Sequence, residues 1–149
     1  FFIIAVMLAI GLRSIRAGLW SMVPNLLPIF FMGGFVGWVY DYADSDMLIV
    51  AILAIGIGVD DTIHFLMRLR IEMRRSGDLD KAIRTTFHYS GRGIVITTLI
   101  LVLGFAPFAT SSYLSLYFFG TMLPMTLVVA LVADLFLVPA MARLGAFKF

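Results

Sequence analysis

The sequence predicts an all-α membrane protein, a polytopic bundle of transmembrane helices. The chain has 149 residues, of which 62% are hydrophobic and 13% are charged, and its apolar residues form long charge-free runs. Soluble domains are typically about 45–50% apolar and about 25% charged. A run of about 20 apolar residues can cross the bilayer as a helix. Because lipid offers no partner for unpaired backbone groups, and the runs lack the alternation of barrel strands, we expect helices.

Five apolar segments follow one another in what we interpret as a single transmembrane domain. Their approximate bounds are 1–12, 19–40, 47–67, 93–110 and 117–142. The first ends at Arg13, after about twelve residues, and is too short to span. No initiator Met or signal peptide precedes it. We therefore expect a truncated first helix in a chain that is part of a longer protein.

One long connection, 68–90, divides at Gly77. Asp78 is a typical helix-capping residue, and four residues then recur at helical spacing on one face: Leu79, Ala82, Ile83 and Thr86. We expect a short interfacial cytoplasmic helix here, lying under the bundle within the loop 68–90. The basic run 68–75 is expected to anchor this loop at the acidic leaflet surface rather than to bind nucleic acid.

The distribution of charge predicts the orientation. Five crossings place every basic residue on one side of the membrane: Arg13, Arg16, Arg68, Arg70, Arg74, Arg75, Lys81, Arg84, Arg92, Arg143 and Lys148. By the positive-inside rule this side is cytoplasmic. The acidic connection 41–46 and the uncharged stretch 111–115 fall on the other side. We expect an integral protein of the cytoplasmic (inner) membrane with a cytoplasmic C-terminus.

Two adjacent acids, Asp60 and Asp61, lie inside the segment 47–67. An ionised carboxylate at membrane depth costs at least ~2.5–3.5 kcal/mol, so an intramembrane acid is functional by default. Adjacent carboxylates in a low dielectric cannot both ionise cheaply, and the pair is expected to share a proton near neutral pH. Proton binding by Asp60 and Asp61 is therefore the leading interpretation. The alternative is a permanently paired or protonated site that locks helix packing.

Nearby residues could assist the pair. Gly56, Asp60 and His64 form one line on a helix, and Gly56 and Gly58 would let a neighbouring helix approach and shield the acids from lipid. His64 is a candidate relay, although an interfacial His with an ordinary hydrogen bond needs no function. Metal binding is disfavoured, because no second His or Cys stands at ligand spacing.

The segment 93–110 is the expected neighbour of this line, through Thr97 or Thr98. These hydroxyls could instead bond to the carbonyl four residues earlier on their own helix. Asp134 is a third acid within an apolar segment. Its short side chain needs a protein or water partner, for a structural or a relay role.

Three stretches resemble one transporter family. The stretch 56–65, Gly-Ile-Gly-Val-Asp-Asp-Thr-Ile-His-Phe, resembles the fourth or tenth transmembrane helix of resistance-nodulation-division (RND) transporters. The stretch 91–98, Gly-Arg-Gly-Ile-Val-Ile-Thr-Thr, is similar to the next helix, and 133–140 to the last helix of a half. The resemblance covers nearly the whole chain. It is closest to the hydrophobe/amphiphile efflux branch, near the mycobacterial-membrane-protein-large (MMPL) and Patched-like families.

This resemblance implies helices two to six of a six-helix repeat, more like the C-terminal half. The expected partners are the bilayer, a hydrophobic or amphiphilic substrate, and the remainder of the same chain, namely the other half and the extracytoplasmic domains. A homo-oligomer is left open, and nucleic acid is not expected. The resemblance also implies that Asp60 and Asp61 bind protons as the coupling ion, without a cofactor, and more weakly that Thr97 and Arg92 act as relays.

The leading interpretation is thus the membrane part of a proton-driven exporter, a secondary transporter. A sterol-sensing-type lipid-binding regulatory domain is the first alternative, although such a sensor has little use for two protonatable acids. An accessory of protein secretion is the second. An enzyme is disfavoured, since His88 and Ser90 lie in a connection without an acid to orient them. Drug, lipid, hopanoid and fatty acid all stay open as substrates.

The charge distribution makes a direct prediction about topology. The chain contains no Cys, so a single Cys probe within it is the only thiol that this chain contributes. Probes at Ser45 and Ser112 of the full-length protein should react with an impermeant reagent from outside intact cells, and a probe at Ser76 should not. Labelling of the Ser76 probe in intact cells would mean that the predicted orientation is wrong.

Overall fold

The computed structural model describes residues 2–12, 14–40 and 44–147 of the chain, which are almost entirely helical and contain no strand. The elements are α1 (Phe2–Gly11), α2 (Ile15–Trp20), α3 (Met22–Val39), α4 (Ser45–Ser76), α5 (Leu79–Thr86), η1 (Phe87–Gly91), α6 (Arg92–Phe105), η2 (Ala106–Thr110), α7 (Leu114–Val132), η3 (Ala133–Leu137) and α8 (Val138–Arg143). Arg13, Asp41 and Lys148, which entered the topology argument, lie outside the described residues.

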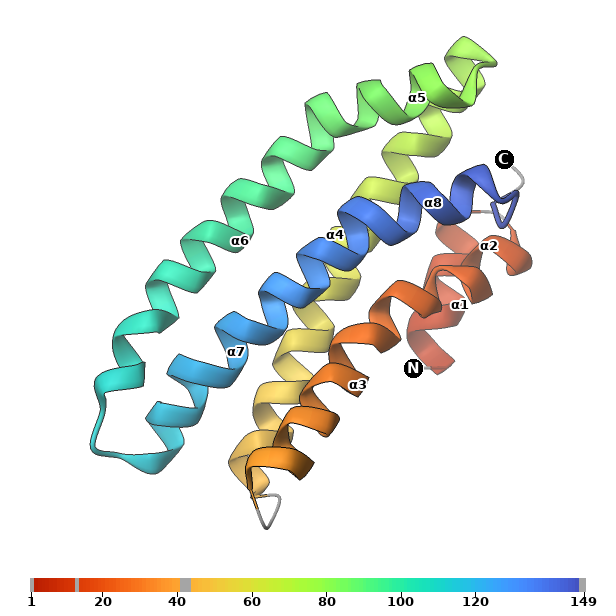
Figure 1. The fold of residues 1–149 in the computed structure, drawn as a ribbon. Coiled ribbons are helices and arrows are strands. Elements are labelled where there is room, and N and C mark those ends of the chain that lie inside the picture. Colours follow the sequence, from red (N-terminus) through yellow and green to blue (C-terminus); the bar gives the residue numbers. More distant parts are fainter. Residues whose placement is uncertain (1, 13, 41–43, 148–149) are drawn as a thin grey trace.

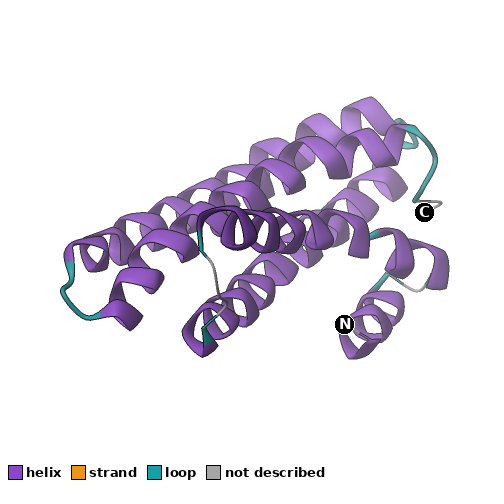
Figure 2. Ribbon diagram, turned by 60° about the horizontal axis from the view of Figure 1, so that its bottom comes forward, coloured by secondary structure: helices purple, strands orange, loops and turns teal. Residues whose placement is uncertain are grey.

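Joined end to end, these elements form four helices that are long and apolar enough to cross a membrane. They are Ile15–Val39, Ser45–Ser76, Leu79–Thr110 and Leu114–Arg143. Figure 1 shows the long helices side by side in an elongated bundle, with the short α1 next to α2. Figure 2 shows that loops are confined to short connections between helices and to the C-terminal end. The predicted all-α transmembrane bundle is confirmed.

The expected loop at 68–90 is instead a helical hairpin. α4 continues to Ser76, and α5 runs through η1 into α6 without a break, so it forms the first turns of a long helix and not a separate helix under the bundle. Only Gly77, with φ 65°, and Asp78 separate the two arms. The carboxylate of Asp78 accepts the backbone N–H groups of Asp80 and Lys81 at 3.0 and 3.4 Å, as expected of an N-cap.

The charged run after residue 67 is helical because its side chains find partners along and across the hairpin. Arg68 forms an ion pair with Glu72, one turn further on, at 2.8 Å. The Arg68 guanidinium also lies 4.8 Å from the centre of the Tyr89 ring. Ala82 and Ile83, on the apolar face of α5, are buried where α5 packs against α4. The charges therefore support helix rather than loop.

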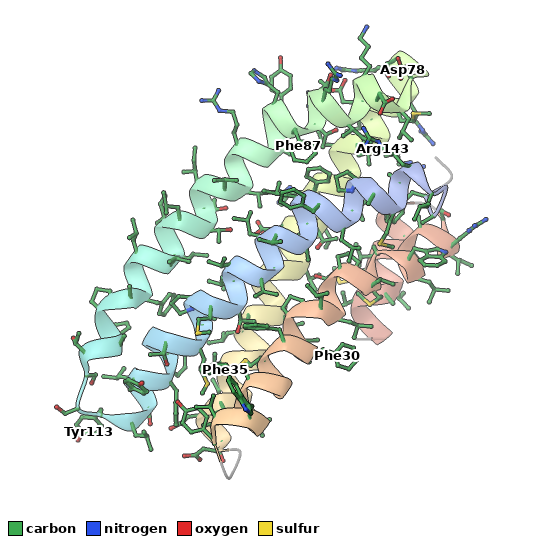
Figure 3. The ribbon with its side chains drawn as sticks, viewed as in Figure 1. Phe30, Phe35, Asp78, Phe87, Tyr113 and Arg143 are labelled. Atoms are coloured by element: carbon green, nitrogen blue, oxygen red, sulfur yellow. The ribbon has the colours of Figure 1, made fainter. Side chains whose placement is uncertain are left out.

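α4 lies at the centre of the bundle and contacts α1, α3, α5 and α7, whereas α6 packs mainly against α7. Two hydrophobic clusters form the interior. One lies near the α4–α5 turn and includes Phe65, Leu69 and Val138; the other lies toward the opposite end and includes Val50 and Phe118. Figure 3 places Asp78 and Arg143 at the first end and Tyr113 at the second.

The close crossing of η2 over α7 can be tested by substitution. A Cβ atom at Gly120 would overlap the backbone of Phe108 and Ala109, whereas one at Gly104 would meet nothing within 4 Å. Gly120→Ala should therefore destabilise the full-length protein by about 1–3 kcal/mol or more. Gly104→Ala should be neutral or stabilising by up to about 1 kcal/mol, because Ala favours helix. Thermal unfolding in detergent measures both, and equal melting temperatures would contradict the crossing.

Candidate functional site

The predicted acid pair is divided between the surface and the interior of the bundle. Asp60 is exposed, Asp61 is half-buried and Thr62 is fully buried. Successive residues on an α-helix are about 100° apart, so this stretch of α4 turns from an open face into the bundle within two residues. The two acids consequently have different surroundings.

Thr62 is the centre of a buried polar cluster that joins three helical segments. Its Oγ1 lies 2.6 Å from Oδ1 of Asp134 in η3, 3.2 Å from Oδ1 of Asn25 in α3, and 3.0 Å from the carbonyl oxygen of Gly58. Asp134 and Asn25 are 2% and 5% exposed. The Asn25 amide donates to the carbonyl of Ser21 at 2.9 Å. Each buried side chain thus has a polar partner, as membrane burial demands.

Gly58 lies where the neighbouring helices come close. A Cβ atom there would lie 3.4 Å from Cβ of Ala130 in α7 and 3.8 Å from Oδ1 of Asn25. Small residues allow such close approach between membrane helices. The glycine therefore helps to bring Asn25 and Thr62 within hydrogen-bonding distance.

Asp134 is positioned by a π-helical turn. In η3 the N–H of Val138 donates to the carbonyl of Ala133, five residues back. Pro139 follows and has no N–H to donate to the carbonyl of Leu135, so the regular α-helical bonding cannot continue through this turn. η3 contacts both α3 and α4. The turn thus brings Asp134 between the two helices that carry its partners, and π turns occur often at functional sites.

Asp60 and His64 share the opposite, open face of α4. Oδ1 of Asp60 lies 3.6 Å from Nε2 of His64, and both side chains are 71% exposed. Gly56 is on the same face, and a Cβ atom there would meet nothing within 4 Å. A carboxylate facing hydrocarbon is costly. In a membrane this face therefore needs a covering of protein or water.

The expected contact between this face and segment 93–110 is wrong for the described part of the chain. α7 packs against both α4 and α6, and no comparable contact joins α6 to α4. Arg92 and Thr97 are exposed, and Thr98 is buried. The Thr97 hydroxyl bonds within its own helix, to the carbonyls of Gly93 and Ile94 at 3.2 and 2.9 Å. The structure brings none of these three side chains to the acids.

Sequence reasoning missed Asn25 and Thr62, although a signal was present for each. Asn25 is the only Asn or Gln in the chain, and it stands inside the apolar segment 19–40. Thr62 directly follows the acid pair and faces inward as the helix turns. Within the described ranges, no group of three His, Cys, Asp or Glu side chains could hold a metal ion.

Comparison with known proteins gives one family. The model of the MMPL family matches residues 1–148. A hopanoid transporter HpnN of Burkholderia multivorans is 29% identical over 97% of the chain, and that of Rhodopseudomonas palustris is 30% identical over 63%. A membrane protein of Methanocaldococcus jannaschii is 29% identical over 68%. The matched regions cover 16%, 11% and 26% of these relatives, respectively. No solved structure gives a significant match.

The cluster around Thr62 predicts a stability difference between two threonines. Thr62→Val removes the hydroxyl shared by Asp134 and Asn25, and should destabilise the full-length protein by about 1–2 kcal/mol. Thr97→Val removes only hydrogen bonds within an exposed helix face, and should change the free energy of unfolding by no more than about 0.5 kcal/mol. Unfolding in mixed detergent and dodecyl sulfate measures both variants. Equal stability of the two would mean that the cluster makes no net contribution.

Proposed function

The chain belongs to the MMPL family, and on this premise we propose that it forms the membrane part of an exporter of hydrophobic or amphiphilic molecules, driven by the proton gradient. The family match covers nearly the whole chain, and two relatives are named hopanoid transporters. The chain spans at most about a quarter of the length of the relatives compared. Substrate recognition would therefore also involve parts of the protein beyond this chain.

The observation that carries the proton-coupling proposal is the Thr62 hydroxyl, which has one hydrogen and three acceptors within 3.2 Å. When Asp134 is ionised, Thr62 donates to it. When Asp134 is protonated, Asp134 can donate to Thr62, and Thr62 can then donate to Asn25 or to the carbonyl of Gly58. Both charge states of Asp134 keep satisfied hydrogen bonds. A buried acid with two satisfied states can take up and release a proton.

Asp60, Asp61 and His64 form the proposed route to this buried acid. Asp60 and His64 meet on the open face of α4, and Asp61 is half-buried between that face and Thr62. Two ionised carboxylates in a low dielectric repel each other, so one proton held between them stabilises the cluster. In this proposal Asp60 and Asp61 exchange protons with the surroundings on the open face of α4, and Asp134 holds a proton inside the polar cluster.

Coupling to transport requires that the two charge states favour different helix arrangements. The Thr62 hydrogen bonds join α3, α4 and η3, so reversing their direction acts on the contact between these helices. Pro28 in α3, Pro124 in α7 and the π turn η3 are points where a helix can bend. We propose that proton uptake shifts these segments and that the shift is transmitted to domains outside the membrane.

The cytoplasmic location of the basic end, and with it the inner-membrane orientation, belongs to the same proposal and rests on the positive-inside rule. The regulatory lipid-binding domain and the secretion accessory have no comparable support.

Acid-to-amide substitutions test the proton site. An asparagine keeps the shape of the aspartate side chain but cannot bind or release a proton. Asp61→Asn and Asp134→Asn should therefore reduce proton-driven export by the full-length protein to background, and so should the Asp60→Asn and Asp61→Asn double variant. His64→Ala should change the pH dependence of export more than its maximal rate. Export of a hopanoid from proteoliposomes under an imposed proton gradient is the measurement.

The control for these variants is Asp80→Asn, which removes an exposed acid paired with Arg143 at 2.9 Å at the end of the bundle. Such surface pairs contribute little to stability, and export should be unchanged. Parental export by the double variant would make the acid pair structural. Parental export by Asp134→Asn alone would remove Asp134 from the route while leaving the pair in place.

A further inference from the structure

A groove of about 370 Å³ opens between the long helix that contains α6 and the segment η3. Its lining is mostly apolar, with one charged side chain: Phe87, Gly91, Arg92, Val95, Ile96 and Leu135. At 1.5 Å per residue, positions 87 to 96 span about 14 Å, roughly half of a hydrocarbon core of about 30 Å. The groove is therefore long enough to receive a headgroup at one end and the upper part of an acyl chain at the other.

The groove lies where two π-helical turns, η1 and η3, face each other. In η1 the N–H of Arg92 donates to the carbonyl of Phe87. Gly91, the last residue of this turn, is buried, and a Cβ atom there would lie 3.3 Å from Cδ1 of Phe87 and 3.7 Å from Cδ2 of Leu135. The absence of a side chain at Gly91 thus keeps the groove open between these two residues.

Arg92 brings a positive charge to this apolar groove. It is the last basic residue before the charge-free run 93–110. The side chain is exposed, and in the described ranges it forms neither a hydrogen bond nor an ion pair. Tyr89, one turn nearer the basic end, is 63% exposed. Since exposed Tyr residues favour the membrane–water interface, Arg92 lies at the boundary between headgroups and hydrocarbon.

We propose that this groove binds an anionic phospholipid, with the phosphate at Arg92 and the upper part of an acyl chain along Val95, Ile96 and Leu135. A guanidinium binds phosphate oxygens through two parallel hydrogen bonds. The apolar lining favours a hydrocarbon chain, which a free phosphate ion lacks. This proposal does not depend on the proposed transport.

Lipid binding to the purified full-length protein tests the site. The probe is a fluorescent phosphatidylglycerol, with the matching phosphatidylcholine as the neutral lipid and inorganic phosphate as a competitor. Arg92→Gln should raise the dissociation constant for phosphatidylglycerol about fivefold, the effect of one basic residue near an anionic headgroup. Ile96→Trp should also weaken binding, because the larger side chain fills the groove.

Two exposed positions outside the groove provide matched controls. Ile100 is 63% exposed and Ile96 is 54% exposed, one turn apart on the same helix, so Ile100→Trp should leave binding unchanged. Arg84→Gln removes an exposed basic residue that does not line the groove, and should also leave phosphatidylglycerol binding unchanged. An equal loss in Arg84→Gln and Arg92→Gln would overturn the proposal in favour of diffuse attraction. Equal affinity for phosphatidylcholine, or full displacement by an equal concentration of inorganic phosphate, would overturn it as well.

Discussion

The need to satisfy a carboxylate buried inside a membrane bundle governs the central part of this structure. Asp134 is 2% exposed, and the hydroxyl of Thr62 lies 2.6 Å from it. That contact requires α4 and η3 to lie close together, and the hydroxyl of Thr62 also reaches Asn25 in α3. Gly58 permits the close approach, and the π turn before Pro139 directs Asp134 inward. The polar cluster and the packing of these helices therefore depend on each other.

The polar cluster lies between two hydrophobic clusters, a placement that suits the proposed proton site. The apolar clusters on either side limit access by water, and the open face with Asp60 and His64 provides an approach from the side. The cluster also joins helices that contain proline or π turns. A change in charge at one acid can then act on segments that are able to bend, which is what energy coupling needs.

The sequence was sufficient to predict the elements of the fold but not their neighbours. Apolar runs located the four long helices, and Gly77 and Asp78 marked the turn, because these features depend on local chemistry. The helical extension after residue 67 was missed, although the four-residue spacing of Arg68 and Glu72 was a local signal for it. The contact of Arg68 with Tyr89 is visible only after folding. The resemblance pointed to Thr97 as a partner of the acids, but α6 packs against α7 and has no comparable contact with α4. The π turn at Asp134 likewise depends on tertiary packing.

In the proposed mechanism, acids in the Thr62 cluster change protonation inside the membrane. Infrared difference spectroscopy on the full-length protein, comparing acidic and alkaline pH, tests this most directly. We expect a carboxylic acid C=O band at acidic pH that disappears as the pH rises and that Asp134→Asn or Asp61→Asn weakens or removes. A spectrum without such a band, or one that both substitutions leave unchanged, would rule out protonation of these acids.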